Sequence, residues 1–194
     1  MGASKHIAVL AGGYSGEADV SRRSAAMVMT HMDRTRFTPY LVNIDPDGWW
    51  VEQPDSGART PVDKETLAYI NTEGATVHAD LAFVMVHGTP GEDGKLQAEL
   101  EAHGIPHTTG DSDSVALTFH KANTNAVLRK QGIHVADSAV IKPNQIWDSE
   151  TLVSELGLPC FVKPNEAGSS LGISRVEKES QLDTAILSAL EIGP

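Results

Sequence analysis

Three glycine-rich segments of the sequence each carry a side chain that could do chemistry. The first, Gly12–Glu17 (GGYSGE), follows a short apolar run and precedes an amphipathic stretch. A glycine-rich turn between a strand and a helix presents backbone N–H groups, which bind anions. The spacing is not Gly-x-Gly-x-x-Gly, so it does not support a dinucleotide site. Glu17 instead offers a carboxylate for a cationic ligand group, although an acid here also suits a helix start.

The second segment, His87–Gly94 (HGTPGEDG), again lies between an apolar run and a helical pattern. His87 is the one side chain in it that ordinarily titrates near neutral pH. Glu92 and Asp93 suit the start of the following helix. The segment is therefore either a tight strand-to-helix connection or part of a site, and its residues alone leave both open.

The third segment runs from Lys163 to Gly172 (KPNEAGSSLG) and places a lysine at the end of an apolar strand. Hydroxyls and backbone amides of a Gly-Ser-Ser loop can fold over phosphates, which the lysine reaches as a point charge. It is not a Walker A loop, because its lysine precedes the glycines and no helix follows. The alternative is a β-hairpin with a flexible loop. Lys121, further upstream, taken alone indicates only a surface lysine.

The elements that would position these segments alternate between strands and helices over the first 110 residues. This rhythm predicts an α/β domain with a parallel sheet. We expect strands at 6–11, 37–45, 81–86 and 105–108, an edge strand at 49–51, a loop at 53–62, and helices at 19–31, 63–71 and 95–103. Asp19 or Ser21 is expected to cap the first helix.

The pattern changes after Gly110, where we place a domain junction, giving domains at 1–110 and 111–194. The second domain mixes helices and strands, so we expect a small α+β fold. Its expected helices are 112–119, 120–131, 149–156 and 181–190, and its expected strands are 138–141, 159–163 and 173–176.

Composition narrows the class of protein. The chain has 26 acidic and 15 basic residues and a net charge of −11, which disfavours general binding of nucleic acid or anionic membranes. Cys160 is the single cysteine, so neither an intrachain disulfide nor a cysteine-based zinc site can form. No stretch approaches the ~20 apolar residues that span a bilayer. We expect a cytoplasmic protein.

In this order, the segments resemble the D-alanine–D-alanine ligase family of ATP-grasp enzymes. Residues 7–17 look like the opening strand and loop of the family, and His87–Gly94 is similar to its His-Gly-x-x-Gly-Glu-Asp-Gly signature. Lys121 falls where the family has a lysine opening a central helix. Lys163 and Gly168–Gly172 resemble its lysine strand and phosphate loop. The resemblance implies a pre-ATP-grasp, Rossmann-like domain followed by the central ATP-grasp subdomain.

The resemblance also assigns roles. Glu17 would bind the ammonium of the first of two D-alanines, Ser169 would orient that end of the site, and His87 would lie nearby. The ATP phosphates would be held by Lys121, Lys163, Gly168, Ser169, Ser170 and Gly172. The reaction makes D-alanyl-D-alanine through an acyl phosphate, for peptidoglycan precursors. The family further implies Mg²⁺ and a homodimer.

The sequence departs from the family pattern in two places. Asn165-Glu166-Ala167 stands where the family has a basic or a different small residue. No Glu-x-Asn pattern of the kind that binds Mg²⁺ follows Gly172, so we expect no metal ligands in this chain. We therefore expect a truncated form without the C-terminal ATP-grasp domain, inactive alone. The alternatives are a non-catalytic module that binds a nucleotide or a D-amino acid, a ligase that joins D-alanine to D-lactate or D-serine, and another ATP-grasp carboxylate–amine ligase.

Overall fold

The computed structural model describes residues 4–53, 56–168 and 170–193. The chain divides into two compact units, residues 1–116 and 117–194. This division falls within helix α3 (Ser112–Phe119), whereas the sequence analysis placed a domain junction near Gly110. Each unit has its own hydrophobic core.

The first unit is built on a five-stranded sheet in the order β4-β3-β2-β1-β7. Three strands are parallel, namely β1 (Lys5–Gly12), β2 (Phe37–Asp45) and β7 (Leu81–Val84). Strands β3 (Gly48–Glu52) and β4 (Arg59–Pro61) extend the sheet in antiparallel pairing. Central strand β1 reads as a continuous apolar run because both of its faces are covered. The expected α/β class is confirmed, with a mixed sheet in place of a wholly parallel one.

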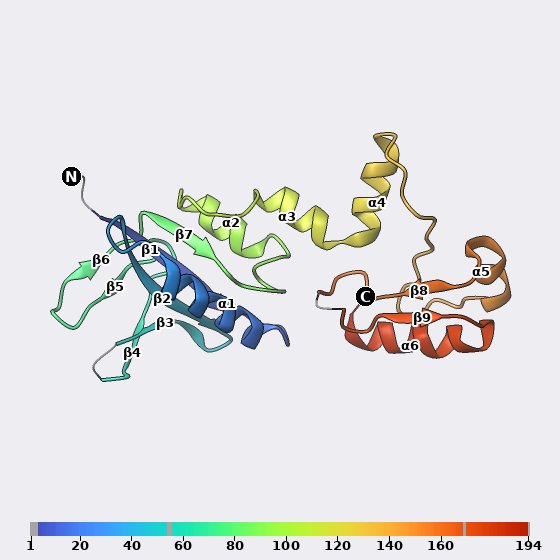
Figure 1. The fold of residues 1–194 in the computed structure, drawn as a ribbon, viewed down its shortest axis with the longest axis horizontal. Coiled ribbons are helices and arrows are strands. Elements are labelled where there is room, and N and C mark those ends of the chain that lie inside the picture. Colours follow the sequence, from blue (N-terminus) through green and yellow to red (C-terminus); the bar gives the residue numbers. More distant parts are fainter. Residues whose placement is uncertain (1–3, 54–55, 169, 194) are drawn as a thin grey trace. The chain divides into compact units, whose positions relative to one another are not determined.

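Two helices cover opposite faces of this sheet (Figure 1). Helix α1 (Ala18–His31) packs through Ala25 on the face that carries Val9. Helix α2 (Lys95–Ala102) packs through Leu96 and Leu100 on the other face, which carries Leu10. Successive residues of a strand point to opposite faces, so β1 contributes to both cores.

Several expected elements of the first unit are wrong. The 49–51 strand is not an edge, because β4 forms within the expected loop 53–62 and pairs with it. Residues 63–71 form no helix: Leu67 has a φ of 52°, its carbonyl accepts a bond from the Tyr40 hydroxyl, and β5 (Tyr69–Ile70) pairs with β6 (Thr76–Val77). The expected strand 105–108 is reduced to a single bridge between Ala82 and His107.

The second unit combines an antiparallel hairpin with helices. Strands β8 (Cys160–Val162) and β9 (Ser174–Val176) pair, and α6 (Leu182–Ile192) lies along them (Figure 1). The remaining elements are α4 (Lys121–Lys130), α5 (Ser149–Leu156) and the short 3-10 helix η1 (Glu179–Gln181). Val176 and Ile186 centre the core. The expected strand 138–141 is absent from this described stretch, where Val140 is half exposed and has no neighbouring strand to pair with.

Within the ranges that the structure describes, none of the helices combines the length and the apolar character needed to cross a bilayer.

Candidate functional site

The loops that follow β1 and β7 meet at one edge of the first unit's sheet. The two strands are hydrogen-bonded in parallel, so their carboxyl ends lie side by side, where α/β sheets usually bind ligands. The backbone N–H of Tyr14 donates to the Thr89 carbonyl at 2.9 Å, and Ser15 Oγ donates to the His87 carbonyl at 3.1 Å. Two of the three sequence-predicted segments are therefore joined directly.

Glu17 sits between these loops, at the position immediately before α1, and is only 6% exposed. Its backbone N–H donates to Ser15 Oγ at 3.2 Å. Its carboxylate packs against Gly88, where an added Cβ would lie 3.1 Å from Glu17 Oε2 and would also collide with Ser15. Gly88 has a φ of +67°, so both its conformation and this close approach require glycine.

The expected helix cap is wrong, because Glu17, and neither Asp19 nor Ser21, occupies the cap position. Ser21 is fully buried and, instead of capping the helix, bonds to two backbone segments. Its hydroxyl accepts from the Gly12 N–H at 2.8 Å and donates to the Met85 carbonyl at 2.7 Å. It therefore ties the end of β1 to the segment after β7 and helps to fix both loops.

His87 is partly exposed, and Glu92 lies beside it. Glu92 Oε2 accepts from the Gly88 N–H at 2.9 Å, while Glu92 Oε1 lies 3.8 Å from His87 Nδ1. From the sequence, Glu92 was expected only to suit the start of the following helix. Its side chain in fact folds back on its own loop and bonds to a backbone N–H four residues earlier, a contact that no signal in the sequence indicated.

The same loop is held from its other end by Asp93 and Gln97. Burial acts to raise the pKa of Asp93, but hydrogen bonds from the Lys95 ammonium at 2.7 Å and the Thr89 hydroxyl at 2.5 Å outweigh it, so that pKa lies below its usual value. The amide of Gln97, fully buried on α2, donates to the Gly91 carbonyl at 2.8 Å. The loop is therefore held in place by contacts within the chain itself.

In the second unit, Lys121 opens α4 and contacts the loop that follows β8. Its ammonium donates to the backbone carbonyls of Ala167 at 2.6 Å and Asn165 at 3.2 Å. The Asn165 side chain accepts from the Ala122 N–H at 2.9 Å. Lys121 and the start of the predicted phosphate loop are thus neighbours, although 40 and more residues separate them in the sequence.

Lys163 directly follows β8 and is exposed. Within the β8–β9 connection, Gly172 has a φ of +68°, and an added Cβ there would lie 2.9 Å from Pro164 Cγ. Ser170 has a φ of 58°. Ser169 lies outside the described residues. The hairpin bearing a lysine and a Gly/Ser connection, expected from the sequence, is present.

The described residues contain no group of three or more His, Cys, Asp or Glu side chains placed to hold a metal ion. Mg²⁺ stays a prediction from the resemblance.

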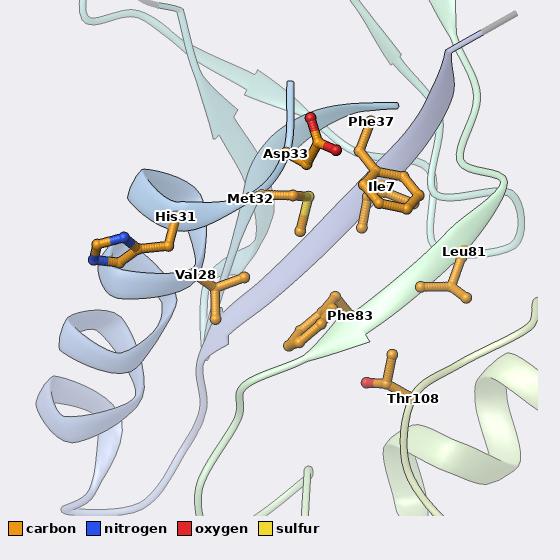
Figure 2. Close-up of a pocket in the computed structure, with 9 residues that line it drawn as sticks. All are labelled: Ile7, Val28, His31, Met32, Asp33, Phe37, Leu81, Phe83 and Thr108. Atoms are coloured by element: carbon orange, nitrogen blue, oxygen red, sulfur yellow. The ribbon is translucent and has the colours of Figure 1, made fainter. Parts of the chain in front are cut away.

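A separate apolar cavity of about 510 Å³ lies in the first unit, toward the amino ends of β1 and β7. Figure 2 shows side chains of these strands, such as Ile7 and Phe83, facing Val28 and Met32 at the end of α1. Its lining includes none of the sequence-predicted site residues. Of those residues, Glu17 and His87 follow the opposite, carboxyl ends of β1 and β7.

The fold is that of an α/β protein with a five-stranded mixed sheet in the first unit and a hairpin with helices in the second. Residues 6–110 match the family model described as D-ala D-ala ligase N-terminus, and residues 127–193 match the model described as D-ala D-ala ligase C-terminus. The chain belongs to the D-alanine–D-alanine ligase family.

Individual relatives can be aligned with nearly the whole length of this chain. A D-alanine–D-alanine ligase from Azobacteroides pseudotrichonymphae is 38% identical over 190 residues, covering 97% of this chain and 58% of that protein. The solved D-alanine–D-alanine ligase from Coxiella burnetii is 29% identical with a TM-score of 0.84, covering 98% of this chain and 61% of that one. A D-Ala:D-Ser ligase from Enterococcus faecalis is 30% identical with a TM-score of 0.78, at 98% and 61% coverage. The chain therefore spans a little under two thirds of the length of these relatives.

Proposed function

We propose that the protein takes part in the ATP-dependent joining of two D-alanines to D-alanyl-D-alanine, a step toward peptidoglycan precursors in the cytoplasm. One observation carries the proposal: in a chain of this family, the loops after β1 and β7 bring the buried Glu17 carboxylate against the His87–Gly88 backbone. That edge offers a negative charge next to hydrogen-bonding groups, which suits a small zwitterion.

The amino-acid site follows from this geometry. Glu17 would bind the ammonium of the first D-alanine, as the family resemblance implies, because its carboxylate lies where the loops after β1 and β7 meet. His87 would lie beside the same substrate, with Glu92 setting the orientation of its ring. Ser169, outside the described residues, is proposed from the resemblance to orient this end of the site.

The second unit would hold the ATP phosphates. Lys121 and Lys163 supply positive charge, while Gly168, Ser169, Ser170 and Gly172 supply the loop that closes over the phosphates. A closed loop excludes water from a reactive acyl phosphate. Bound Mg²⁺ would neutralise phosphate charge during transfer; the resemblance places its ligands in the part of the family's length that this chain does not span.

The proposed chemistry proceeds in two transfers. An oxygen of the first D-alanine's carboxylate attacks the terminal phosphorus of ATP, and ADP leaves. The amine of the second D-alanine then attacks the acyl carbon, phosphate leaves, and the amine loses a proton. Positioning and charge stabilisation by the residues above are the protein's main contribution to both steps.

A second candidate is a ligase that joins D-alanine to D-serine, favoured by the 30% identical relative named for that product. Mass analysis of the product formed from an equal mixture of D-alanine and D-serine separates the two. A dipeptide containing serine as the main product would replace the first proposal by the second.

The direct test is phosphate release by the native protein with ATP and D-alanine together. We expect release that requires both substrates, and a strong loss of turnover in Lys163→Ala with a raised ATP requirement. Lys142→Ala is the control, since Lys142 is an exposed lysine of the same unit. Calorimetric binding of both ligands without phosphate release would instead indicate a non-catalytic binding module, and binding of neither would refute both.

A further inference from the structure

Helix α2 carries a glutamine that is completely buried beside the loop after β7. Gln97 is 0% exposed, on a helix whose other buried side chains, Leu96 and Leu100, are apolar. A buried amide costs free energy unless it is hydrogen-bonded, so the partners of Gln97 show what it contributes. Both bonds found for it among the described residues start from the side-chain nitrogen Nε2, while the oxygen Oε1 receives none there. The contribution of this amide to the site therefore runs through its two N–H donors.

The two donors join the loop to the segment that lies beside β7. Gln97 Nε2 donates to the Gly91 carbonyl at 2.8 Å and to the Thr109 hydroxyl at 3.2 Å. The segment of Thr109 is held by the sheet, because His107 forms a parallel bridge with Ala82 of β7. The Thr109 hydroxyl also lies 3.0 Å from His107 Nδ1. Through Gln97, the carbonyl of Gly91 is therefore tied to the strand from which its own loop begins.

From Gly91 the contacts continue to the Glu17 carboxylate. The Gly91 N–H donates to the Gly88 carbonyl at 2.8 Å, and the Gly88 N–H donates to Glu92 Oε2 at 2.9 Å, so this turn is closed by two bonds. Gly91 packs so closely on Val86 that an added Cβ would lie 2.4 Å from the Val86 carbonyl oxygen. At the other end of the turn, an added Cβ at Gly88 would lie 3.1 Å from Glu17 Oε2. Because close-packed segments transmit strain, a shift of the Gly91 carbonyl would move the backbone that faces Glu17.

We propose that Gln97 is a positioning residue for the first D-alanine: its amide fixes the turn that holds Gly88 against Glu17. The inference rests on the proposed role of Glu17 in binding the substrate ammonium. Gln97 acts through the turn and touches no substrate itself. Without its two N–H donors, the Gly91 carbonyl loses its bond, and the turn is no longer tied to the segment beside β7.

A second buried glutamine provides a matched control. Gln53, 7% exposed, also donates from Nε2 to a threonine hydroxyl, Thr60 Oγ1 at 2.8 Å, and to a backbone carbonyl, that of Ile70 at 3.0 Å. It follows β3, which runs antiparallel to β2, so it lies toward the amino end of β2 and away from the site edge. Methionine in place of glutamine gives an unbranched side chain of similar length without the amide. Gln97→Met and Gln53→Met therefore remove equivalent bonds, and only the first of them affects the site loop.

The test measures phosphate release by the native protein and by both variants over a range of D-alanine and ATP concentrations. For Gln97→Met we expect the KM for D-alanine to rise about fivefold, the equivalent of one net hydrogen bond, with an unchanged KM for ATP. Gln53→Met should keep both KM values. A purely structural role of Gln97 would reduce the folded fraction, and therefore kcat, without changing either KM. A KM for D-alanine that is the same in Gln97→Met and Gln53→Met overturns the inference.

Hydrogen exchange of the unliganded protein separates this inference from the proposed function. In Gln97→Met, we expect the amides of Gly88 and Gly91 to exchange about fivefold faster relative to those of β1. Gln53→Met should leave this ratio unchanged. If the native protein neither binds D-alanine nor releases phosphate with it, the proposed role of Glu17 fails, and the exchange rates alone decide whether Gln97 positions the turn. Equal exchange ratios in the two variants overturn that positioning.

Discussion

The Glu17 carboxylate is the side chain on which the proposed amino-acid site depends most. Glu17→Gln keeps the size of the side chain and removes its charge. We expect D-alanine binding to weaken about tenfold or more, the order of one lost charge-assisted hydrogen bond, with ATP affinity little changed. Calorimetry with each ligand gives both values. Glu99→Gln, at an exposed acid of α2, is the control. Equal D-alanine affinity in both variants would remove Glu17 from the site.

The Asp93 carboxylate, in the loop after β7, contributes to the folding stability of the protein through its hydrogen bonds. Its pKa is lowered in the folded chain, so the carboxylate stabilises the fold above its usual titration range, and this contribution is lost as the pH falls through the lowered pKa. We expect Asp93→Asn to lower the free energy of unfolding by about 1 kcal/mol at neutral pH. The difference from the unsubstituted protein should shrink toward zero in acid.

Urea unfolding at several pH values checks this prediction. Asp137→Asn serves as the control, because Asp137 is an exposed acid. A stability difference for Asp93→Asn that is the same at neutral and acid pH would mean that its hydrogen bonds do not depend on the charge.

The segments after β1 and β7 contact each other closely, and Gly88 lies against Ser15 and Glu17 at one of these contacts. Gly88→Ala would strain a φ of +67° and push a Cβ into Ser15 and toward Glu17. Gly74→Ala meets a similar φ of +79° with open space around it, so it measures the backbone strain alone. We expect Gly88→Ala to cost about 1–3 kcal/mol more than Gly74→Ala, because only it overpacks the loop contact.

Gly88→Ala should also weaken D-alanine binding, whereas Gly74→Ala should not, since only the former displaces Glu17. Thermal unfolding and calorimetry of the two variants measure both effects. Equal costs in the two variants would show that the loop yields freely at this contact.

The elements that local pattern specifies were predictable from the sequence. Apolar runs located β1, β2 and β7, and helical spacing located α1 and α2. Prediction failed where the structure depends on distant partners. Residues 63–71 look helical, but the Tyr40 hydroxyl fixes the Leu67 carbonyl in a non-helical turn. Residues 59–61 are polar and contain a proline, yet they pair with β3 at the sheet edge.

In the candidate site too, the type of a residue could be judged from the sequence, whereas its contacts with distant segments could not. Glu17 and His87 stood out because an acid and a histidine beside glycines after apolar runs indicate chemistry. Glu92, Gln97 and Asn165 did not, since their side chains bond to backbone groups whose positions only the folded chain defines.

At the scale of the whole chain, most of the residues proposed to bind D-alanine and most of those proposed to bind ATP belong to different units. Each unit has its own core. Glu17 and His87, proposed to bind D-alanine, belong to the first unit, while Lys121 and Lys163, proposed to bind ATP, belong to the second.

Hydrogen exchange of the native protein measures directly which unit each ligand protects. With D-alanine we expect slower exchange of the amides at 14–17 and 87–92, and with ATP slower exchange at 165–168 and 170–172. Because a ligand protects the amides that it orders, the pattern should differ between the two ligands. Protection by D-alanine confined to the second unit would reverse the assignment, while protection of both units by ATP alone would show that nucleotide binding orders the amino-acid loops as well.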